Sequence, residues 1–266
     1  VVNDAIKSGK VKGAALDVFE KEPPEGNPLL ELDNVIAVPH LGASTQEAQD
    51  NVGIAVAEQV IDALLGRGVR NAANMPSFDV ETMTSLKPWI TLAERLGVFV
   101  GQLSSKGGIK KISIGYSGEV TDYELTPLTL AMVKGILSPV MEEGEVNYVN
   151  APVIAKERGI EVVESKSSHL GDFSNALSLT VELADQTFSV LGTLFANDSP
   201  RLVRINDYVI DANLDGVMLF IHNSDKPGFI GELGTLLGQY DINIGEMTLG
   251  RTKEGEIAIT AVRTDQ

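Results

Sequence analysis

His40 is the residue whose type and surroundings are best suited to proton transfer. It follows a short apolar run in "NVIAVPHLGAST" (34–45), while Asp17 ends another apolar run and Glu22 lies in the proline-rich loop after it. A carboxylate bonded to one ring nitrogen holds a histidine in a single tautomer and makes it more basic. General acid/base catalysis near neutral pH requires such a group. A surface turn in which a histidine merely lies near acidic residues is the alternative.

Two buried strands are expected to position these side chains. The runs "GAALDVF" (13–19) and "NVIAVP" (34–39) are typical of parallel strands, and the loop 20–28 with its three prolines separates them. The carboxyl ends of parallel strands meet at one edge of a sheet, where open α/β folds bind ligands. A long helix should then begin at residue 46, capped by Ser44 or Thr45.

The rest of the chain predicts an α+β region followed by a shorter module. Residues 69–79 lack periodicity and contain a proline, so we place a boundary there. Pro88 suits the first turn of a helix that ends near residue 103. The spacing of later apolar runs predicts a largely antiparallel sheet, with strands at 109–118, 160–166, 176–183, 186–195 and 201–210. The last part of the chain then predicts one strand, one helix and two further strands, in that order. The expected fold class is therefore a multidomain α/β and α+β protein.

Composition excludes several function classes. The net charge of −16 disfavours nucleic acid and acidic membranes as partners. The cluster of Lys106, Lys110 and Lys111 is the best local candidate for binding such a partner, and a solvated loop and strand end is the alternative. The longest apolar runs are far shorter than the ~20 residues that cross a bilayer. With no cysteine in the sequence, disulfides and thiolate ligands are excluded, which fits a cytoplasmic protein. We predict no metal site.

A glycine-rich stretch near residue 230 has the composition of a dinucleotide-binding motif but not its spacing. Gly228, Gly231, Gly234 and Gly238 recur every three or four residues, along one flank of a predicted helix, rather than clustering at its start. We therefore expect a helix whose glycine flank packs closely on a sheet, with Asp225 helping to cap its beginning.

The first 45 residues resemble the closing part of the nucleotide-binding domain of the D-2-hydroxyacid dehydrogenases. The likeness rests on "GAALDVFEKEPP" and "NVIAVPHLGAST", and it is greatest to the long-form phosphoglycerate dehydrogenases. It implies that His40 is the catalytic acid/base oriented by Glu22. It also implies that Asp17, His40, Gly42 and Ala43 border the nicotinamide of NAD, with 3-phosphoglycerate as the small-molecule substrate in L-serine biosynthesis.

The segment "VMLFIHNSDKPGFIGELG" resembles an ACT domain, a small βαββαβ module that binds amino-acid effectors. In serine-regulated relatives the effector lies between two such modules, and the matching positions are Asn223, Asp225 and Asn243. The resemblance implies a homo-oligomer, a dimer or a tetramer, with L-serine as the candidate effector. The alternative is that Asp225 only caps a helix and Asn243 only turns the chain.

The middle region resembles the extra domain of the long-form enzymes in the order of its elements. Arg201 matches a basic position of an anion site in those relatives, whereas Asn213 falls where they carry arginine. Placement of Arg201 and Arg204 at a strand edge is the alternative. His222 should be half-buried, and His169 receives no role.

The resemblance divides the chain into four parts. These are a remnant of the nucleotide-binding domain, a long helix with a linker, an intervening allosteric domain and a truncated ACT domain, at 1–45, 46–77, 78–214 and 215–266. No G-x-G-x-x-G motif precedes His40, so we expect the cofactor cradle and the substrate-binding arginine of a parent dehydrogenase to lie outside these 266 residues. The chain alone should then be inactive and mainly regulatory. A stand-alone amino-acid-binding regulator is the alternative, and a different 2-hydroxyacid dehydrogenase fits the two added domains less well.

Overall fold

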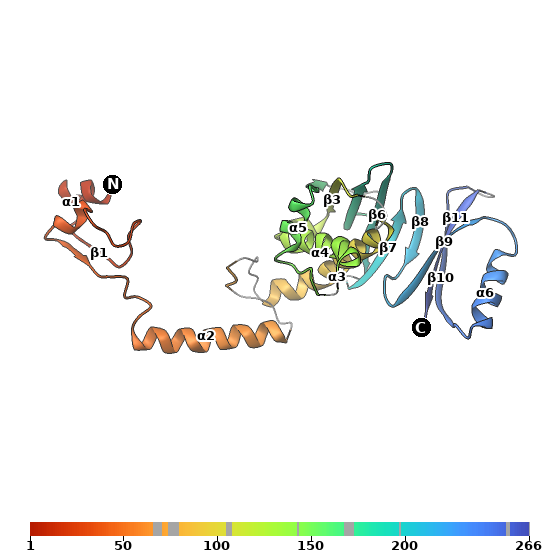
Figure 1. Ribbon diagram of the computed structural model, residues 1–266, viewed down its shortest axis with the longest axis horizontal. Coiled ribbons are helices and arrows are strands. Elements are labelled where there is room, and N and C mark those ends of the chain that lie inside the picture. The colour runs from red at the N-terminus through yellow and green to blue at the C-terminus, as the bar shows by residue number, and fades with distance from the viewer. Residues whose placement is uncertain are drawn as a thin grey trace. The chain divides into compact units, whose positions relative to one another are not determined.

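The chain forms two compact units, Val1–Arg70 and Asn71–Gln266. The computed structural model describes residues 1–65, 71–73, 80–104, 108–142, 144–167, 173–196, 198–253 and 256–265, with only the backbone of 80–83. Figure 1 shows the order of the helices and strands along the chain.

The first unit contains a small parallel sheet and one long helix. Strand β1 pairs in parallel with β2, with Ala14 opposite Val35 and Leu16 opposite Ala37. Both strands are shorter than the apolar runs predicted, because the chain turns away immediately after each of them. The elements of this unit are α1 (Val2–Lys7), β1 (Ala14–Leu16), the 3₁₀ helix η1 (Pro28–Glu31), β2 (Val35–Ala37) and α2 (Gln46–Leu64).

Helix α2 begins where the sequence predicts. Of the two candidate capping residues, Thr45 is the cap, since its hydroxyl oxygen accepts a hydrogen bond from the Ala48 N–H at 3.1 Å. This bond satisfies one of the backbone donors that a helix start leaves unpaired.

A six-stranded sheet dominates the second unit, in the order β4-β3-β5-β6-β7-β8. Only the β3–β4 pair is parallel, since helices α4 and α5 carry the chain between these two strands. The predicted, largely antiparallel sheet is therefore confirmed. Its strands are β3 (Lys111–Ser117), β4 (Glu161–Ser167), β5 (Ala176–Glu182), β6 (Thr187–Phe195), β7 (Ser199–Ile205) and β8 (Tyr208–Ala212).

The strand predicted at 201–210 is wrong, because two strands occupy that region. The chain turns between β7 and β8 at Asn206, whose φ is +48°. Asparagine adopts this left-handed conformation more readily than most residues. Its backbone N–H donates to the Ser189 carbonyl, and its side-chain oxygen accepts from the Ser189 N–H, each at 2.8 Å. These bonds fix the turn against the neighbouring strand.

Helices α3 and α4 cross closely beside this sheet. Helix α3 (Val80–Leu103) begins before Pro88, so the prediction that this proline lies in a first turn is wrong. A Cβ on Gly97 would collide with the Met132 carbonyl oxygen of α4 (Thr126–Leu137), and a Cβ on Gly135 would collide with the Glu94 carbonyl. Glycine at the crossing thus allows the two backbones to touch. The remaining helical elements are η2 (Glu119–Asp122), η3 (Ser138–Val140) and α5 (Ala151–Glu157).

A three-stranded antiparallel sheet with one helix completes the second unit (Figure 1). Its strand order is β10-β11-β9, and β10 packs beside β8. One face joins the main core, where the Phe99 and Phe220 ring centroids lie 4.5 Å apart. Helix α6 packs near the other face through Leu237, which is 7% exposed. The elements are β9 (Val217–Ser224), α6 (Phe229–Gln239), β10 (Ile244–Arg251) and β11 (Ile257–Thr264).

The glycine flank of α6 does not pack on the sheet, so the expected role of these glycines is wrong. A Cβ on Gly231, Gly234 or Gly238 would meet nothing within 4 Å. Instead, the apolar flank, with Leu233 and Leu237, faces inward. The expected capping role of Asp225 is also wrong, because Gly228 occupies the N-cap position with φ +100° and no side-chain bond caps the helix.

Candidate functional site

The structure brings His40 and Glu22 together. Nδ1 of His40 lies 2.9 Å from Oε2 of Glu22, and the other carboxylate oxygen accepts from the Phe19 N–H at 3.0 Å. An ionised carboxylate only accepts hydrogen bonds, so Nδ1 carries the proton. In the neutral ring, Nε2 is then the proton acceptor. The His40 side chain is 55% exposed, which leaves this nitrogen accessible.

The contact shifts the pKa values of both groups so that their charged forms, and therefore an ion pair, are favoured. The hydrogen bond to Glu22 raises the pKa of His40, and the negative charge of Glu22 adds to this shift. The bond from His40, followed by the one from the Phe19 N–H, lowers the pKa of Glu22. Both shifts favour the charged forms, so Glu22 makes His40 a stronger base.

Asp17 fixes the loop that carries His40. Its two carboxylate oxygens accept from the Leu41 N–H at 2.6 Å and from the Gly42 N–H at 2.8 Å. Its carbonyl oxygen accepts from the His40 N–H at 3.1 Å. His40 itself has φ +55°, a left-handed conformation that costs energy for a side chain with a Cβ. The bonds from Asp17 hold the loop in this conformation.

Sequence reasoning missed this positioning role of Asp17. The residue was expected only as a cofactor contact, and an aspartate that ends a strand carries no signal of which backbone groups it will accept. The strand register supplies that information, since it sets the end of β1 beside the residue after β2.

The four residues expected to contact the cofactor lie at the ends of β1 and β2 and in the loop after β2. They are Asp17, His40, Gly42 and Ala43. Beyond the two bonds from the loop, the Asp17 carboxylate retains lone pairs that can accept from an amide NH₂. The Ala43 carbonyl already accepts from the Gln49 side chain at 2.5 Å and also keeps an acceptor site. These two acceptors, which lie next to His40 and Gly42 in the loop, suit the NH₂ group of a nicotinamide carboxamide.

Two of the three expected effector residues lie together at one end of the three-stranded sheet. Asn223 is 8% exposed, and its side-chain oxygen accepts from the Thr260 hydroxyl at 2.8 Å. The Asp225 carboxylate accepts from Arg251 at 3.0 Å. Both side chains therefore already have partners within the module.

Asn243 lies at the opposite end of this sheet. Asn223 pairs with Ala258 in the strand register, whereas Asn243 donates from its side chain to Asp265 at 2.6 Å. Residues 258 and 264 of β11 are six apart, which corresponds to about 20 Å at the usual rise of a strand. One small ligand cannot contact both ends of a single module.

Arg201 is bound by carboxylates of this chain. Its guanidinium Nη1 lies 2.8 Å from Glu246 Oε1 and 3.6 Å from Asp211. The second Glu246 oxygen lies 3.6 Å from Nε of Arg263. The edge placement considered for Arg201 is wrong, because β7 lies inside the sheet between β6 and β8. Arg201 instead links the six-stranded sheet to the three-stranded sheet.

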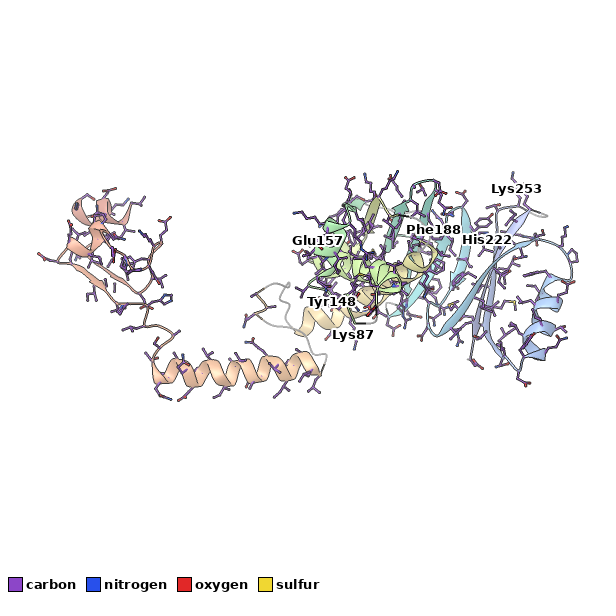
Figure 2. The ribbon with its side chains drawn as sticks, in the orientation of Figure 1. Lys87, Tyr148, Glu157, Phe188, His222 and Lys253 are labelled. Atoms are coloured by element: carbon purple, nitrogen blue, oxygen red, sulfur yellow. The ribbon has the colours of Figure 1, made fainter. Side chains whose placement is uncertain are left out.

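The other polar residues considered from the sequence form no second site. His222, labelled in Figure 2, is exposed rather than half-buried, and its ring meets the Tyr208 ring edge-on at 6.4 Å. Lys111 lies 3.7 Å from Glu161, while His169 and Lys106 fall outside the described residues. In the part of the chain that the structure describes, no three histidine or acidic side chains gather as for a metal ion. No described helix is long and apolar enough to cross a membrane.

Comparison with protein families divides the chain into three matched regions. Residues 1–42 match the D-isomer specific 2-hydroxyacid dehydrogenase NAD binding domain. Residues 85–206 match the D-3-phosphoglycerate dehydrogenase intervening domain, and residues 217–266 match the ACT domain.

Curated relatives match the chain almost from end to end. The D-3-phosphoglycerate dehydrogenase of Methanocaldococcus jannaschii is 42% identical over 262 residues, covering 98% of this chain and 49% of the relative. The enzyme of the same name from Synechocystis is also 42% identical over 262 residues, with 98% and 47% covered. That of Bacillus subtilis is 39% identical over 263 residues, with 99% and 50% covered. The chain thus spans about half the length of these relatives. With its three matched domains in this order, it belongs to the family of D-3-phosphoglycerate dehydrogenases that carry an intervening domain and an ACT domain.

Proposed function

We propose that the whole protein is an NAD-dependent dehydrogenase that oxidises 3-phosphoglycerate to 3-phosphohydroxypyruvate, the first step towards L-serine. The 2.9 Å contact between His40 and Glu22 carries this proposal, because a histidine held in one tautomer is what oxidation of an alcohol requires. The names of the relatives supply the substrate. The lack of cysteine fits action in a reducing cytoplasm.

In this reaction the chain's own residues move one proton. Nε2 of neutral His40 accepts the proton of the substrate hydroxyl, while Nδ1–H remains bonded to Glu22. The Glu22 carboxylate stabilises the imidazolium that forms, since opposite charges in contact favour the charged state. Asp17 keeps the ring in position by holding the backbone of the next two residues.

Asp17, Ala43 and Gly42 are the residues that would hold the nicotinamide carboxamide beside His40. When bound, NAD would accept the hydride from the carbon whose hydroxyl group gives its proton to His40. The acceptor oxygens of Asp17 and Ala43 would accept hydrogen bonds from its carboxamide NH₂ and so help to orient the ring.

The test is NADH formation from 3-phosphoglycerate by the whole protein and its His40→Gln variant. Gln keeps the size and polarity of the side chain but cannot accept a proton, and general-base catalysis contributes about 10²- to 10⁴-fold in rate. We expect kcat to fall by that factor with little change in KM. A kcat of the variant close to that of the unmodified protein would reject His40 as the base.

We further propose that the ACT region binds an amino-acid effector, L-serine, between two copies of the chain. The support is the separation of Asn243 from Asn223 and Asp225, because a ligand that needs all three must take them from two modules. Asp225 can accept from an ammonium, and the asparagine amides can donate to a carboxylate. The assembly would be at least a dimer.

Complementation between variants tests this arrangement. Asp225→Ala and Asn243→Ala chains should each bind L-serine at least tenfold more weakly by calorimetry, given that bonds to charged groups are worth about 1.5–3 kcal/mol. In an equal mixture of the two variants, half of the dimers should contain one chain of each kind. Each such dimer has one site with both substitutions and one site with neither, so binding should return at a quarter or more of all sites. Lys253→Ala, an exposed residue, serves as the control. Failure of the mixture to regain binding would contradict a shared site.

A further inference from the structure

A cavity of about 440 Å³ lies in the second unit, and none of the residues discussed above as catalytic or effector-binding lines it. Helix α4, helix α5 and strand β4 form its walls. Known ligand pockets span about 300–1,000 Å³, so its size suits a small molecule. Strand β4 is the outermost strand of the six-stranded sheet, so the cavity lies at the edge of that sheet.

The floor of the cavity is apolar. Val133 of α4 is 2% exposed, and Ala155 of α5 and Ile160 are 1% and 9% exposed. Leu130 and Val162 complete the lining as half-buried side chains. An aliphatic group placed here would leave water and contact only carbon atoms, which stabilises binding in proportion to the area covered.

The carboxylate of Glu164 lies at the rim of the cavity. Glu164 follows Val162 by two residues on β4, so both side chains face the helices. One Glu164 oxygen, Oε1, accepts a hydrogen bond from the Thr129 hydroxyl, and the Tyr116 hydroxyl lies 2.7 Å from the same Thr129 oxygen. Thr129 has a single proton to donate, so the buried Tyr116 donates to Thr129. This chain of bonds fixes Glu164 in place while its second oxygen remains available.

A basic side chain, that of Lys156, also lies at the rim of the cavity. Lys156, in the last turn of α5, lines the same cavity and is exposed. Neither Lys156 nor Glu164 forms an ion pair with any residue that the structure describes. One negative and one positive charge therefore flank an apolar floor without neutralising each other.

We propose that this cavity binds a free L-α-amino acid with a branched apolar side chain, of the size of leucine. The ammonium lies against the Glu164 carboxylate, the carboxylate lies against Lys156, and the aliphatic side chain rests on Val133, Ala155 and Ile160. The site belongs to the intervening region and is separate from the proposed serine site. It depends on neither the dehydrogenase activity nor the ACT effector.

The pairing of opposite charges favours an amino acid over other small amphiphiles. An aliphatic amine would satisfy Glu164 but leave Lys156 unmatched, and an aliphatic acid would do the reverse. Glycine carries both charges but covers none of the apolar floor. The ligand that matches all three features is a zwitterion with an aliphatic side chain.

Methyl-detected NMR titration of the full chain with L-leucine tests the proposal. We expect shifts of the Leu130, Val133, Ile160 and Val162 methyl signals with a Kd of about 1 mM or below, a typical affinity for a ligand of this size. Glycine, isopentylamine and 4-methylpentanoate should each bind at least tenfold more weakly. Equal binding of any one of these three, or no shift with L-leucine, would overturn the proposal.

Two charge variants test the rim residues separately. Glu164→Gln keeps an oxygen that accepts from Thr129, and Lys156→Met keeps the aliphatic stem. Each should weaken leucine binding about tenfold or more, as expected for loss of a charged hydrogen bond. Glu157→Gln and Lys253→Met, which alter exposed residues labelled in Figure 2 that do not line the cavity, are the matched controls. Unchanged affinity in both rim variants would overturn the proposal, and should a variant fail to fold, the ligand series on the unmodified chain still decides.

Discussion

Gly42 lies in direct contact with Asp17. Its N–H donates to Asp17 Oδ2 at 2.8 Å, and a Cβ built on Gly42 would lie only 2.7 Å from that same oxygen. The aspartate can therefore hold the loop after His40 only because residue 42 has no side chain. The position of His40, the proposed base, depends on this pair.

Gly42→Ala should displace Asp17 and release the loop. We expect faster amide hydrogen exchange at Leu41 and residue 42, because both N–H groups lose their acceptor. A displacement of about 1 Å at a catalytic group can cost about 10²-fold in rate. We therefore expect a fall of that order in kcat for the whole protein.

Gly53→Ala is the matched control, since a Cβ at Gly53 on helix α2 would meet nothing within 4 Å. It should leave both the exchange rates near His40 and the rate of catalysis unchanged. Wild-type exchange in the Gly42→Ala variant would show that Asp17 does not hold the loop.

The candidate site was predictable from the sequence in its residue types but not in its bonds. The apolar runs at 13–19 and 34–39 bring Asp17, Glu22 and His40 to one sheet edge, and the structure agrees. The roles within that group depend on backbone positions after the strands end. No periodicity specifies which N–H groups will face the Asp17 carboxylate.

Glycines in two helices should respond oppositely to alanine. Gly97→Ala places a methyl group against the Met132 carbonyl at the crossing of α3 and α4, so it should lower the free energy of unfolding by about 1–3 kcal/mol. Gly234→Ala on α6 has open space and gains helix propensity, so it should raise that free energy by up to about 1 kcal/mol. Thermal unfolding of the two variants checks both signs. Stabilisation by Gly97→Ala would contradict the close crossing.

The glycine pattern shows why part of the fold was not predictable. Glycine spaced every three or four residues indicates only that one helix flank lacks side chains, and it does not say whether a neighbour covers that flank. Gly234 faces open space, whereas Gly97 and Gly101, which have the same spacing, lie at a helix contact. The turn at Asn206 was missed for a similar reason, since its bonds to Ser189 come from a neighbouring strand.

Glu246 should stabilise the contact between the two sheets of the second unit. Its side chain is 31% exposed and lies between Arg201 and Arg263, so Glu246→Ala leaves two arginines facing each other. We expect a loss of about 1.5–3 kcal/mol in the free energy of unfolding. In the exposed pair Lys253–Glu256, the variant Glu256→Ala should cost less than about 1 kcal/mol. Equal effects of the two variants would contradict a linking role for Glu246.

The His40–Glu22 pair should also make stability depend on pH. The pKa of His40 is raised from 6.5, so its contribution is complete below pH 6.5 and is lost as pH rises through the raised value. The pKa of Glu22 is lowered from 4.5, so its contribution is complete above pH 4.5 and is lost as pH falls through the lowered value. The pair therefore stabilises the first unit most between about pH 4.5 and 6.5. Urea unfolding of the unmodified chain and Glu22→Gln, followed through signals of residues 1–65, should differ most in that window, and a constant difference across pH would contradict the coupling.

The most direct test of His40 as a base held by Glu22 is its NMR titration in the unmodified chain and in Glu22→Gln. The His40 ring signals should titrate with a pKa above 6.5 in the unmodified chain, and the pKa should move down towards 6.5 in the variant, because the charge and the strong acceptor on Nδ1 are gone. An identical midpoint for His40 in both would contradict the account, since Glu22 would then neither orient the ring nor raise its basicity.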